Sequence, residues 1–181
     1  MNKMKGCLAF IDILGFSALK NEDFSYKFVT YHEIVNAACK NPVHYRMYSD
    51  SLILYTEALT KDHLMKQLSA VSEITYGLLM QLDIPVRGCV SAGDFTVNKG
   101  GESVVIAGKP LIDAYGYEKK QDWVGTMLSP QLVKLIDKEI NLESVVNITT
   151  RSKADAKDLE ERLPWSMLIQ RCHTIPYRQT K

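Results

Sequence analysis

Apolar residues follow two patterns along most of this chain, one typical of strands and one typical of helices. Short apolar stretches, several rich in β-branched and aromatic residues, predict strands at 5–14, 44–56, 84–92, 95–97, 103–107 and 126–128. Longer stretches with apolar residues three or four positions apart predict helices at 16–39, 61–82, 109–120 and 130–137. This order of strands and helices favours an α+β fold, with a βαββαβ ferredoxin-like core sheet and helices packed on it.

Turn-forming residues predict where several of these elements end. Gly93-Asp94 is expected to form a turn that separates two short strands, and Gly100-Gly101 a second turn. The stretch 44–56 is either one strand or a hairpin that bends at Asp50.

Composition narrows the classes of function. The 181 residues fit a single domain, 1–181. Lys and Arg total 22 and Asp and Glu total 21, which gives a net charge of +1. A protein whose main partner is a long nucleic acid normally carries a strong basic excess, so we expect no nucleic-acid partner. A small anionic ligand needs only a local cluster of donors.

Cysteine usage and the N-terminal segment bear on localisation. The four cysteines form no CxxC pair and favour buried free thiols over a disulfide. The apolar stretch after 1–6 is interrupted at Asp12, too early for the core of a signal peptide. We therefore expect a cytoplasmic protein with no stable membrane association.

Two aspartates are the first candidates for chemistry. Asp12 lies inside an otherwise apolar strand, where a carboxylate is costly to bury unless it is paired or bound to a cation. Asp50 lies at the bend within 44–56. If the two strands are neighbours, both carboxylates can face one Mg²⁺ or Mn²⁺ ion, which binds few carboxylates and keeps positions for phosphate oxygens. Alternatively, Asp12 caps the next helix or pairs with a lysine, and Asp50 is a turn residue.

The residues after Asp12 suggest an anion site. Gly15, Phe16 and Ser17 lead into the first predicted helix, and free backbone N–H groups at such a start bind phosphates when a glycine allows close approach. One glycine alone is a weak signal, which the neighbouring carboxylate strengthens.

Three further residues are candidates for substrate contacts. Arg46, Tyr48 and Asp50 alternate, so on a strand they share one face, where Arg46 and Tyr48 can stack on or hydrogen-bond to a base. An exposed arginine and a half-buried tyrosine explain the pattern equally well. Arg87 either neutralises phosphate charge or pairs with Asp83 or Asp94.

The order of these motifs resembles the class III adenylate/guanylate cyclase superfamily over about residues 5–136. FIDILGFS at 10–17 resembles the strand that carries the first metal aspartate, and YSDS at 48–51 the hairpin that carries the second. Looser similarities are IPVRG at 84–88 with SAG at 91–93, GKPLIDAYGYE at 108–118, and MLS at 127–129. The resemblance implies a class III cyclase catalytic domain with residues 138–181 as a family-specific C-terminal extension.

Four departures from the superfamily pattern concern the recognition of the base and the transition state. Arg46 replaces a lysine or glutamate of purine cyclases, and Val105 replaces a base-reading aspartate. Ile112 and Gly116 stand where the family has a helix asparagine and arginine. Recognition of adenine or guanine in the usual way is therefore not expected.

Within the superfamily, this combination most resembles the pyrimidine (uridylate/cytidylate) cyclases of the Pycsar anti-phage system. That resemblance implies a homodimer that converts UTP, or CTP, to a 3′,5′-cyclic nucleotide and pyrophosphate, and a cyclic product that acts on a separate effector protein. It implies two Mn²⁺ or Mg²⁺ ions held by Asp12, the Ile13 carbonyl and Asp50. Tyr48 would face the pyrimidine and Arg87 the triphosphate or the transition state. Uridylate cyclase is the first choice.

Alternative functions stay open at this point. One is a cytidylate or purine cyclase, and another is a catalytically inactive cyclase-like module that binds a nucleotide. The missing helix asparagine and arginine favour the inactive module, whereas the presence of both metal aspartates favours an enzyme.

Overall fold

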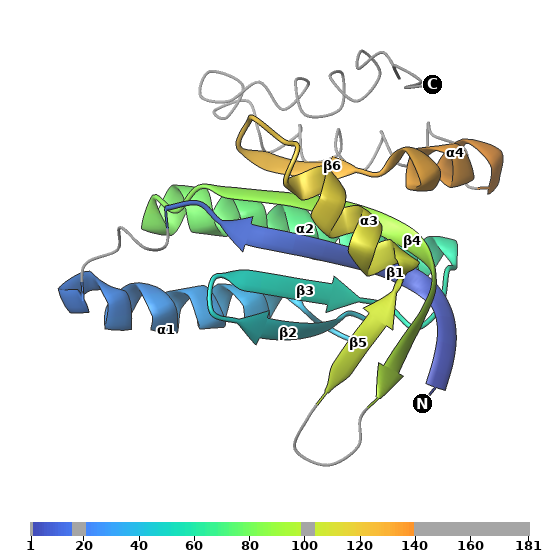
Figure 1. Cartoon of the computed structure of the whole chain (residues 1–181). Helices are drawn as coiled ribbons and strands as arrows, with labels where there is room; N and C mark the ends of the chain where they lie inside the picture. Colours follow the sequence, from blue (N-terminus) through green and yellow to red (C-terminus); the bar gives the residue numbers. More distant parts are fainter. Residues whose placement is uncertain (1, 16–20, 99–103, 140–181) are drawn as a thin grey trace, which may run out of the picture. The chain divides into compact units, whose positions relative to one another are not determined.

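The computed structural model describes residues 2–15, 21–98 and 104–139. Its elements, in chain order, are β1 (Asn2–Ile13), α1 (Asn21–Ala38), β2 (His44–Tyr48), β3 (Ser51–Tyr55), α2 (Lys61–Leu82), β4 (Val86–Asn98), β5 (Val105–Gly108), α3 (Lys109–Glu118), β6 (Gly125–Leu128) and α4 (Pro130–Glu139) (Figure 1). The chain divides into two compact units, 1–132 and 133–181. The sheet lies in the first unit, and the single domain expected from the sequence stays a prediction, as does the C-terminal extension.

The six strands form one sheet in the order β2-β3-β1-β4-β5, with β6 parallel to β4. β1 lies at the centre and is antiparallel to both β3 and β4. The first six elements follow the order βαββαβ, so the predicted α+β class and core topology are confirmed.

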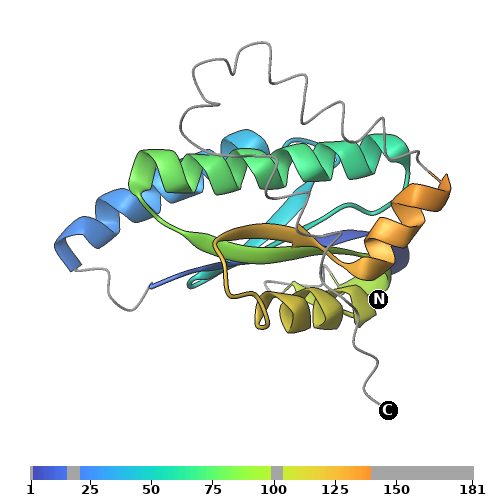
Figure 2. The ribbon, with the colours of Figure 1, turned by 90° about the horizontal axis from the view of Figure 1, so that it is seen from above.

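Helices cover both faces of this sheet. α1 and α2 lie on one face, and α3 lies on the other (Figure 2). Because neighbouring residues of a strand point to opposite faces, β1 supplies side chains to both layers. The face toward α3 carries Leu8, Phe10 and then Asp12, and a hydrophobic core forms there with Ala114 of α3.

Local signals explain the limits of α2, which matches the predicted range. The Thr60 hydroxyl accepts a hydrogen bond from the backbone N–H of His63, as an N-cap does. At the other end Asp83 adopts a left-handed conformation and its N–H donates to the Leu78 carbonyl, and Pro85 follows. Among the described helices, none has the length and apolar character needed to cross a membrane.

The stretch 44–56 is a hairpin rather than a single strand. β2 and β3 pair antiparallel, and Tyr48 lies opposite Ser51 across a two-residue turn. Ser49 has φ 55° in this turn. The hairpin places Asp50 at the tip, as one of the two sequence interpretations predicted.

The predicted turn at Gly93-Asp94 is wrong, since β4 runs through it without a break. Gly93 lies opposite Gly6 and Asp94 opposite Lys5 in the β1–β4 ladder. A turn here would forfeit the hydrogen bonds of the N-terminal half of β1, so pairing over the whole length of β1 overrides the local turn preference. The predicted turn at Gly100-Gly101 lies outside the described residues.

Candidate active site

One row of side chains crosses the sheet where β1 ends. Tyr48 of β2 lies opposite Ser51 of β3, Ser51 lies opposite Asp12 of β1, and Asp12 lies opposite Arg87 of β4. Residues directly opposite each other on antiparallel strands point to the same face. Phe10, two residues before Asp12, contacts Tyr115 of α3 edge to face, so this row lies on the α3 side of the sheet.

Asp12 is a half-buried carboxylate near the end of β1. The Ser51 hydroxyl donates a hydrogen bond of 3.1 Å to its Oδ1 atom. Burial raises the pKa of Asp12 above its ordinary value, the Ser51 hydrogen bond lowers it, and repulsion from Asp50 raises it further. The structure therefore brings the two aspartates close enough to interact.

The hairpin turn is tied directly to the end of β1. The backbone N–H of Ile13 donates a 3.0 Å hydrogen bond to the Asp50 carbonyl. On α1, burial raises the pKa of Tyr31, and the charges of Asp12 and Asp50 add to that effect. The condition stated for a shared cation is thus met, because β1 and β3 are neighbouring strands.

These residues fit a divalent cation. Two partly buried carboxylates that repel each other are stabilised by a cation between them, and Mg²⁺ characteristically takes one or two carboxylates and completes its shell with water and phosphate oxygens. Within the described part of the chain, no group of three or more His, Cys, Asp or Glu is placed to hold a metal. The set would therefore be Asp12, Asp50 and the backbone carbonyl of Ile13, and these metal roles stay predictions.

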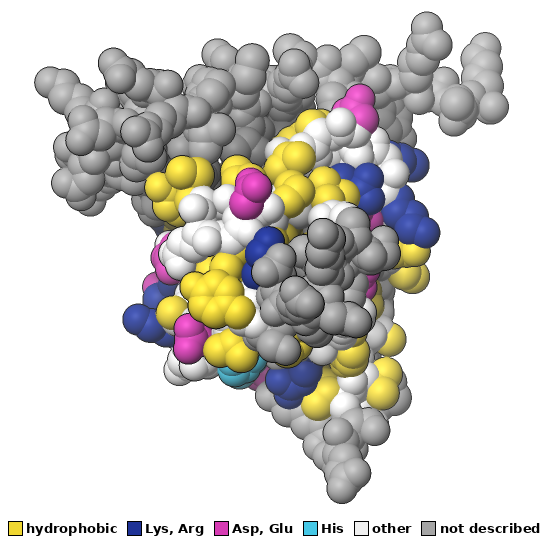
Figure 3. Space-filling view, turned by 90° about the vertical axis from the view of Figure 1, so that its left-hand side faces the viewer, with side chains coloured by type: hydrophobic (Ala, Val, Ile, Leu, Met, Phe, Trp, Pro, Cys, Tyr) yellow, Lys and Arg dark blue, Asp and Glu magenta, His cyan; other side chains and the backbone are white. Residues whose placement is uncertain are grey.

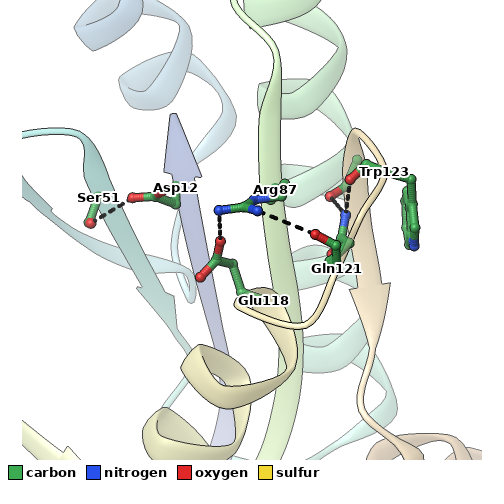
Figure 4. Close-up of polar contacts among 7 residues, drawn as sticks. Asp12, Ser51, Arg87, Glu118, Gln121 and Trp123 are labelled. Carbon is green, nitrogen blue, oxygen red and sulfur yellow. Dashed lines mark hydrogen bonds and ion pairs between the residues drawn. The ribbon is translucent and has the colours of Figure 1, made fainter. Parts of the chain in front are cut away.

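Arg87 is already engaged by other protein groups. Its Nη2 atom lies 2.9 Å from Oε1 of Glu118, and its Nη1 donates a 3.3 Å hydrogen bond to the Gln121 carbonyl (Figure 4). The pairing of Arg87 with Asp83 or Asp94 that the sequence suggested is wrong, because the ion-pair partner of Arg87 is Glu118. Asp94 instead lies 3.3 Å from the ammonium group of Lys3.

Glu118 and Gln121 are site residues that the sequence analysis did not identify. Glu118 is only 2% exposed, and burial raises its pKa whereas Arg87 lowers it. The Gln121 side chain donates to the carbonyls of Trp123 and Gly125, at 2.8 and 2.6 Å. A glutamate at the end of an amphipathic helix is expected to be exposed to solvent, so only the packing of α3 on the sheet reveals this one.

The predicted base-contacting residues make protein contacts in this structure. Arg46 lies on β2, and its Nη1 atom donates a 2.7 Å hydrogen bond to the Tyr45 carbonyl. Tyr48 is 48% exposed, and its hydroxyl donates to the Val104 carbonyl at 3.2 Å. Their substrate roles stay predictions.

The predicted phosphate-binding turn is described only at its start. Gly15 has φ 73°, a left-handed conformation that favours glycine, and an added Cβ would meet no atom within 4 Å. Phe16 and Ser17 lie outside the described residues. α1 is described from Asn21, and the first part of the predicted helix, 16–20, lies outside the described residues.

Charges on the visible face of Figure 3 are interspersed. Lys and Arg side chains lie among Asp, Glu and hydrophobic side chains, and the described residues of this face show no continuous basic surface. This pattern agrees with the near-zero net charge of +1.

This chain is similar to known proteins in its structure but not detectably in its sequence. No protein-family profile matches the chain, and no curated protein matches it in sequence. The guanylyl cyclase domain of the RhoGC fusion protein from the aquatic fungus Blastocladiella emersonii is similar, with a TM-score of 0.61 at 17% identity, covering 76% of this chain and 86% of that one. The adenylyl cyclase CyaB from P. aeruginosa has a TM-score of 0.59 at 14% identity, covering 77% and 84%.

A third similar structure is of a different kind. It is a class III adenylyl cyclase-like ATP-binding protein from Pseudomonas aeruginosa, with a TM-score of 0.51 at 12% identity, covering 71% of this chain and 34% of that one. Together these likenesses establish that the chain has the fold of class III cyclase catalytic domains.

Proposed function

We propose that this protein is a nucleotidyl cyclase that converts UTP to 3′,5′-cyclic UMP and pyrophosphate. The observation that carries the proposal is the meeting of Asp12 and Asp50, two carboxylates from separate strands, at the end of β1. The cyclase fold and the motif order of the sequence support the same activity.

The reaction needs groups that bind the triphosphate and let the 3′-oxygen attack the α-phosphorus. The new P–O bond forms as the bond to pyrophosphate breaks, and the proton of the 3′-hydroxyl passes to solvent water. Two Mn²⁺ or Mg²⁺ ions would lower the pKa of that hydroxyl and neutralise charge on the phosphates. Asp12, Asp50 and the Ile13 carbonyl would hold them.

Other residues of this chain would bind and orient the substrate. Gly15, with Phe16 and Ser17 after it, would offer backbone N–H groups to the leaving pyrophosphate. Arg87 would stabilise charge on the triphosphate or the transition state, and Tyr48 with Arg46 would contact the pyrimidine.

The proposed active form is a homodimer, and the similar guanylyl cyclase domain of the fungal fusion protein is itself dimeric. Large hydrophobic side chains are exposed on β5 and α3, where Val105 is 53% exposed, Ile112 70% and Tyr115 43%. Ile112 occupies the place of the family's helix asparagine, so a second chain would cover an apolar side chain there.

The proposed role is synthesis of a second messenger in bacterial anti-phage defence, in the cytoplasm, with a separate effector protein that binds the cyclic product. It is supported by the resemblance of the SDS and RG motifs to the Pycsar cyclases.

The assay that tests the activity uses purified protein, Mn²⁺ and each of ATP, GTP, CTP and UTP, with products resolved by mass spectrometry. A dominant cyclic UMP peak, absent from Asp50→Asn and retained in Asp94→Asn, is the expected result. Asp94 is a suitable control because it is an exposed aspartate on β4 paired with Lys3. Cyclic CMP, cyclic AMP or cyclic GMP as the main product would change the substrate and keep the reaction.

A second candidate is a nucleotide-binding module without turnover. The cyclase-like ATP-binding protein favours it, as do Ile112 and Gly116 in place of the asparagine and arginine. Nucleotide binding by calorimetry, together with no cyclic product from any of the four triphosphates, would support this candidate and contradict a cyclase.

A further inference from the structure

The ion pair between Arg87 and Glu118 lies directly beside the proposed metal ligand Asp12. We propose that Glu118 is a positioning residue: with the Gln121 carbonyl it holds and neutralises Arg87, so that Asp12 stays free to bind a divalent cation. This inference rests on the proposed function, because it concerns the affinity of the same site for its cation.

Arg87 pairs with Glu118 although Asp12 lies directly opposite it on the neighbouring strand. Arg87 and Asp12 lie opposite each other on adjacent strands and on the same face, a placement in which an arginine and an aspartate commonly form a salt bridge. The structure instead gives the guanidinium a 2.9 Å ion pair with Glu118. Asp12 takes a hydrogen bond from Ser51 on its other side (Figure 4).

Both acceptors for Arg87 lie in the short segment 118–121 at the end of α3. Glu118 ends α3 and is 2% exposed, and Gln121 is 4% exposed. The backbone N–H of Gln121 donates to the Glu118 carbonyl at 2.9 Å, and the Gln121 side chain is held by two further carbonyls. A buried carboxylate and a buried carbonyl on the same turn hold the guanidinium from two directions.

Glu118 also changes the balance of charge around Asp12. Asp12 interacts with the charges of Asp50, Arg87 and Lys119, and Glu118 interacts with Asp12, Arg87 and Lys119. With Glu118 ionised, the carboxylates of this cluster outnumber its cations. Without Glu118, the charge of Arg87 would offset much of the charge of the two aspartates, and a divalent ion would gain less by binding. Glu118 thus preserves the negative potential that attracts the cation.

The experiment measures binding of Mn²⁺ alone to the full chain by isothermal titration calorimetry, without nucleotide. Glu118→Gln, which keeps the shape and removes the charge, should weaken Mn²⁺ binding about tenfold, a size typical of coupling within one ion-pair network. Asp113→Asn makes the same change on the same helix, in a pair with the exposed Lys109, and should stay within about twofold of the wild type.

A double variant separates the charge effect from a role in folding. Arg87→Gln/Glu118→Gln removes both members of the pair, so Mn²⁺ binding should return to within about threefold of the wild type. A residue that acts only by supporting the fold would show no such rescue. If Glu118→Gln fails to fold, as judged by circular dichroism, Glu118→Asp keeps the charge at a shorter reach and should weaken binding about threefold.

Each outcome bears on the proposal. Unchanged binding by folded Glu118→Gln, or by Glu118→Asp where it is the variant that folds, overturns the inference and leaves the proposed metal site intact. Binding by the double variant as weak as that of Glu118→Gln also overturns it. Absence of Mn²⁺ binding by the wild type overturns the proposed metal site and this inference together.

Discussion

The two faces of β1 carry different kinds of side chain. Toward α1 and α2 the strand presents Cys7, Ala9, Ile11 and Ile13, all of which are buried. Toward α3 it presents Leu8 and Phe10 and then changes to Asp12, which is half-buried beside Ser51 and Arg87. The first face buries apolar side chains along its whole length, which stabilises the fold. The second face buries apolar side chains only up to Phe10 and carries charged groups at the end of the strand.

Moving a carboxylate from the second face to the first should have the largest effect. Ile11 is 1% exposed, so Ile11→Asp buries a charge with no partner in an apolar layer. We expect a loss of about 4 kcal/mol in the free energy of unfolding, measured by urea denaturation. Ile11→Val, the control, should cost about 1 kcal/mol. A loss for Ile11→Asp no larger than that of the control would show that this face tolerates charge.

Removing the carboxylate from the second face should affect activity far more than stability. Asp12→Leu replaces a half-buried charge with an apolar side chain next to Phe10. The free energy of unfolding should therefore stay within about 1 kcal/mol of the wild type. Cyclic nucleotide production should fall by at least about 100-fold, because a metal ligand is lost. Full activity in this variant would remove Asp12 from the site.

The pH dependence of stability should give the smallest effect. Burial and then Asp50 raise the pKa of Asp12, against the Ser51 hydrogen bond, so the folded protein holds this proton more tightly than the unfolded chain does. Its contribution to stability therefore falls as the pH rises from the ordinary aspartate pKa of about 3.9 through the raised value.

Urea midpoints of the metal-free protein, measured in small pH steps across that range, should decline more steeply for the wild type than for Asp12→Asn. Asp94→Asn is the control on the exposed carboxylate of β4. A wild-type curve that rises through this window more steeply than that of Asp12→Asn would mean that folding lowers the Asp12 pKa, and would contradict a pKa raised by burial.

Much of the fold was predictable because its signals are local. Capping by Thr60 and Pro85 after Asp83 delimit α2, and the turn at Asp50 closes a hairpin between two β-rich stretches. The turn predicted at Gly93-Asp94 failed because those residues pair with Gly6 and Lys5, which are distant in sequence. Local turn preference is weak compared with an uninterrupted ladder of backbone hydrogen bonds.

The candidate site divides in the same way. The sequence by itself determined that Asp12 would lie in an apolar strand and Asp50 at a bend, because a charge inside a hydrophobic run and a turn between two strands are visible in order along the chain. Only the tertiary structure decided that Arg87 pairs with Glu118 rather than with Asp83 or Asp94. That choice depends on where α3 packs against β4, and the partner of a buried charge is set by packing and distance rather than by spacing in sequence.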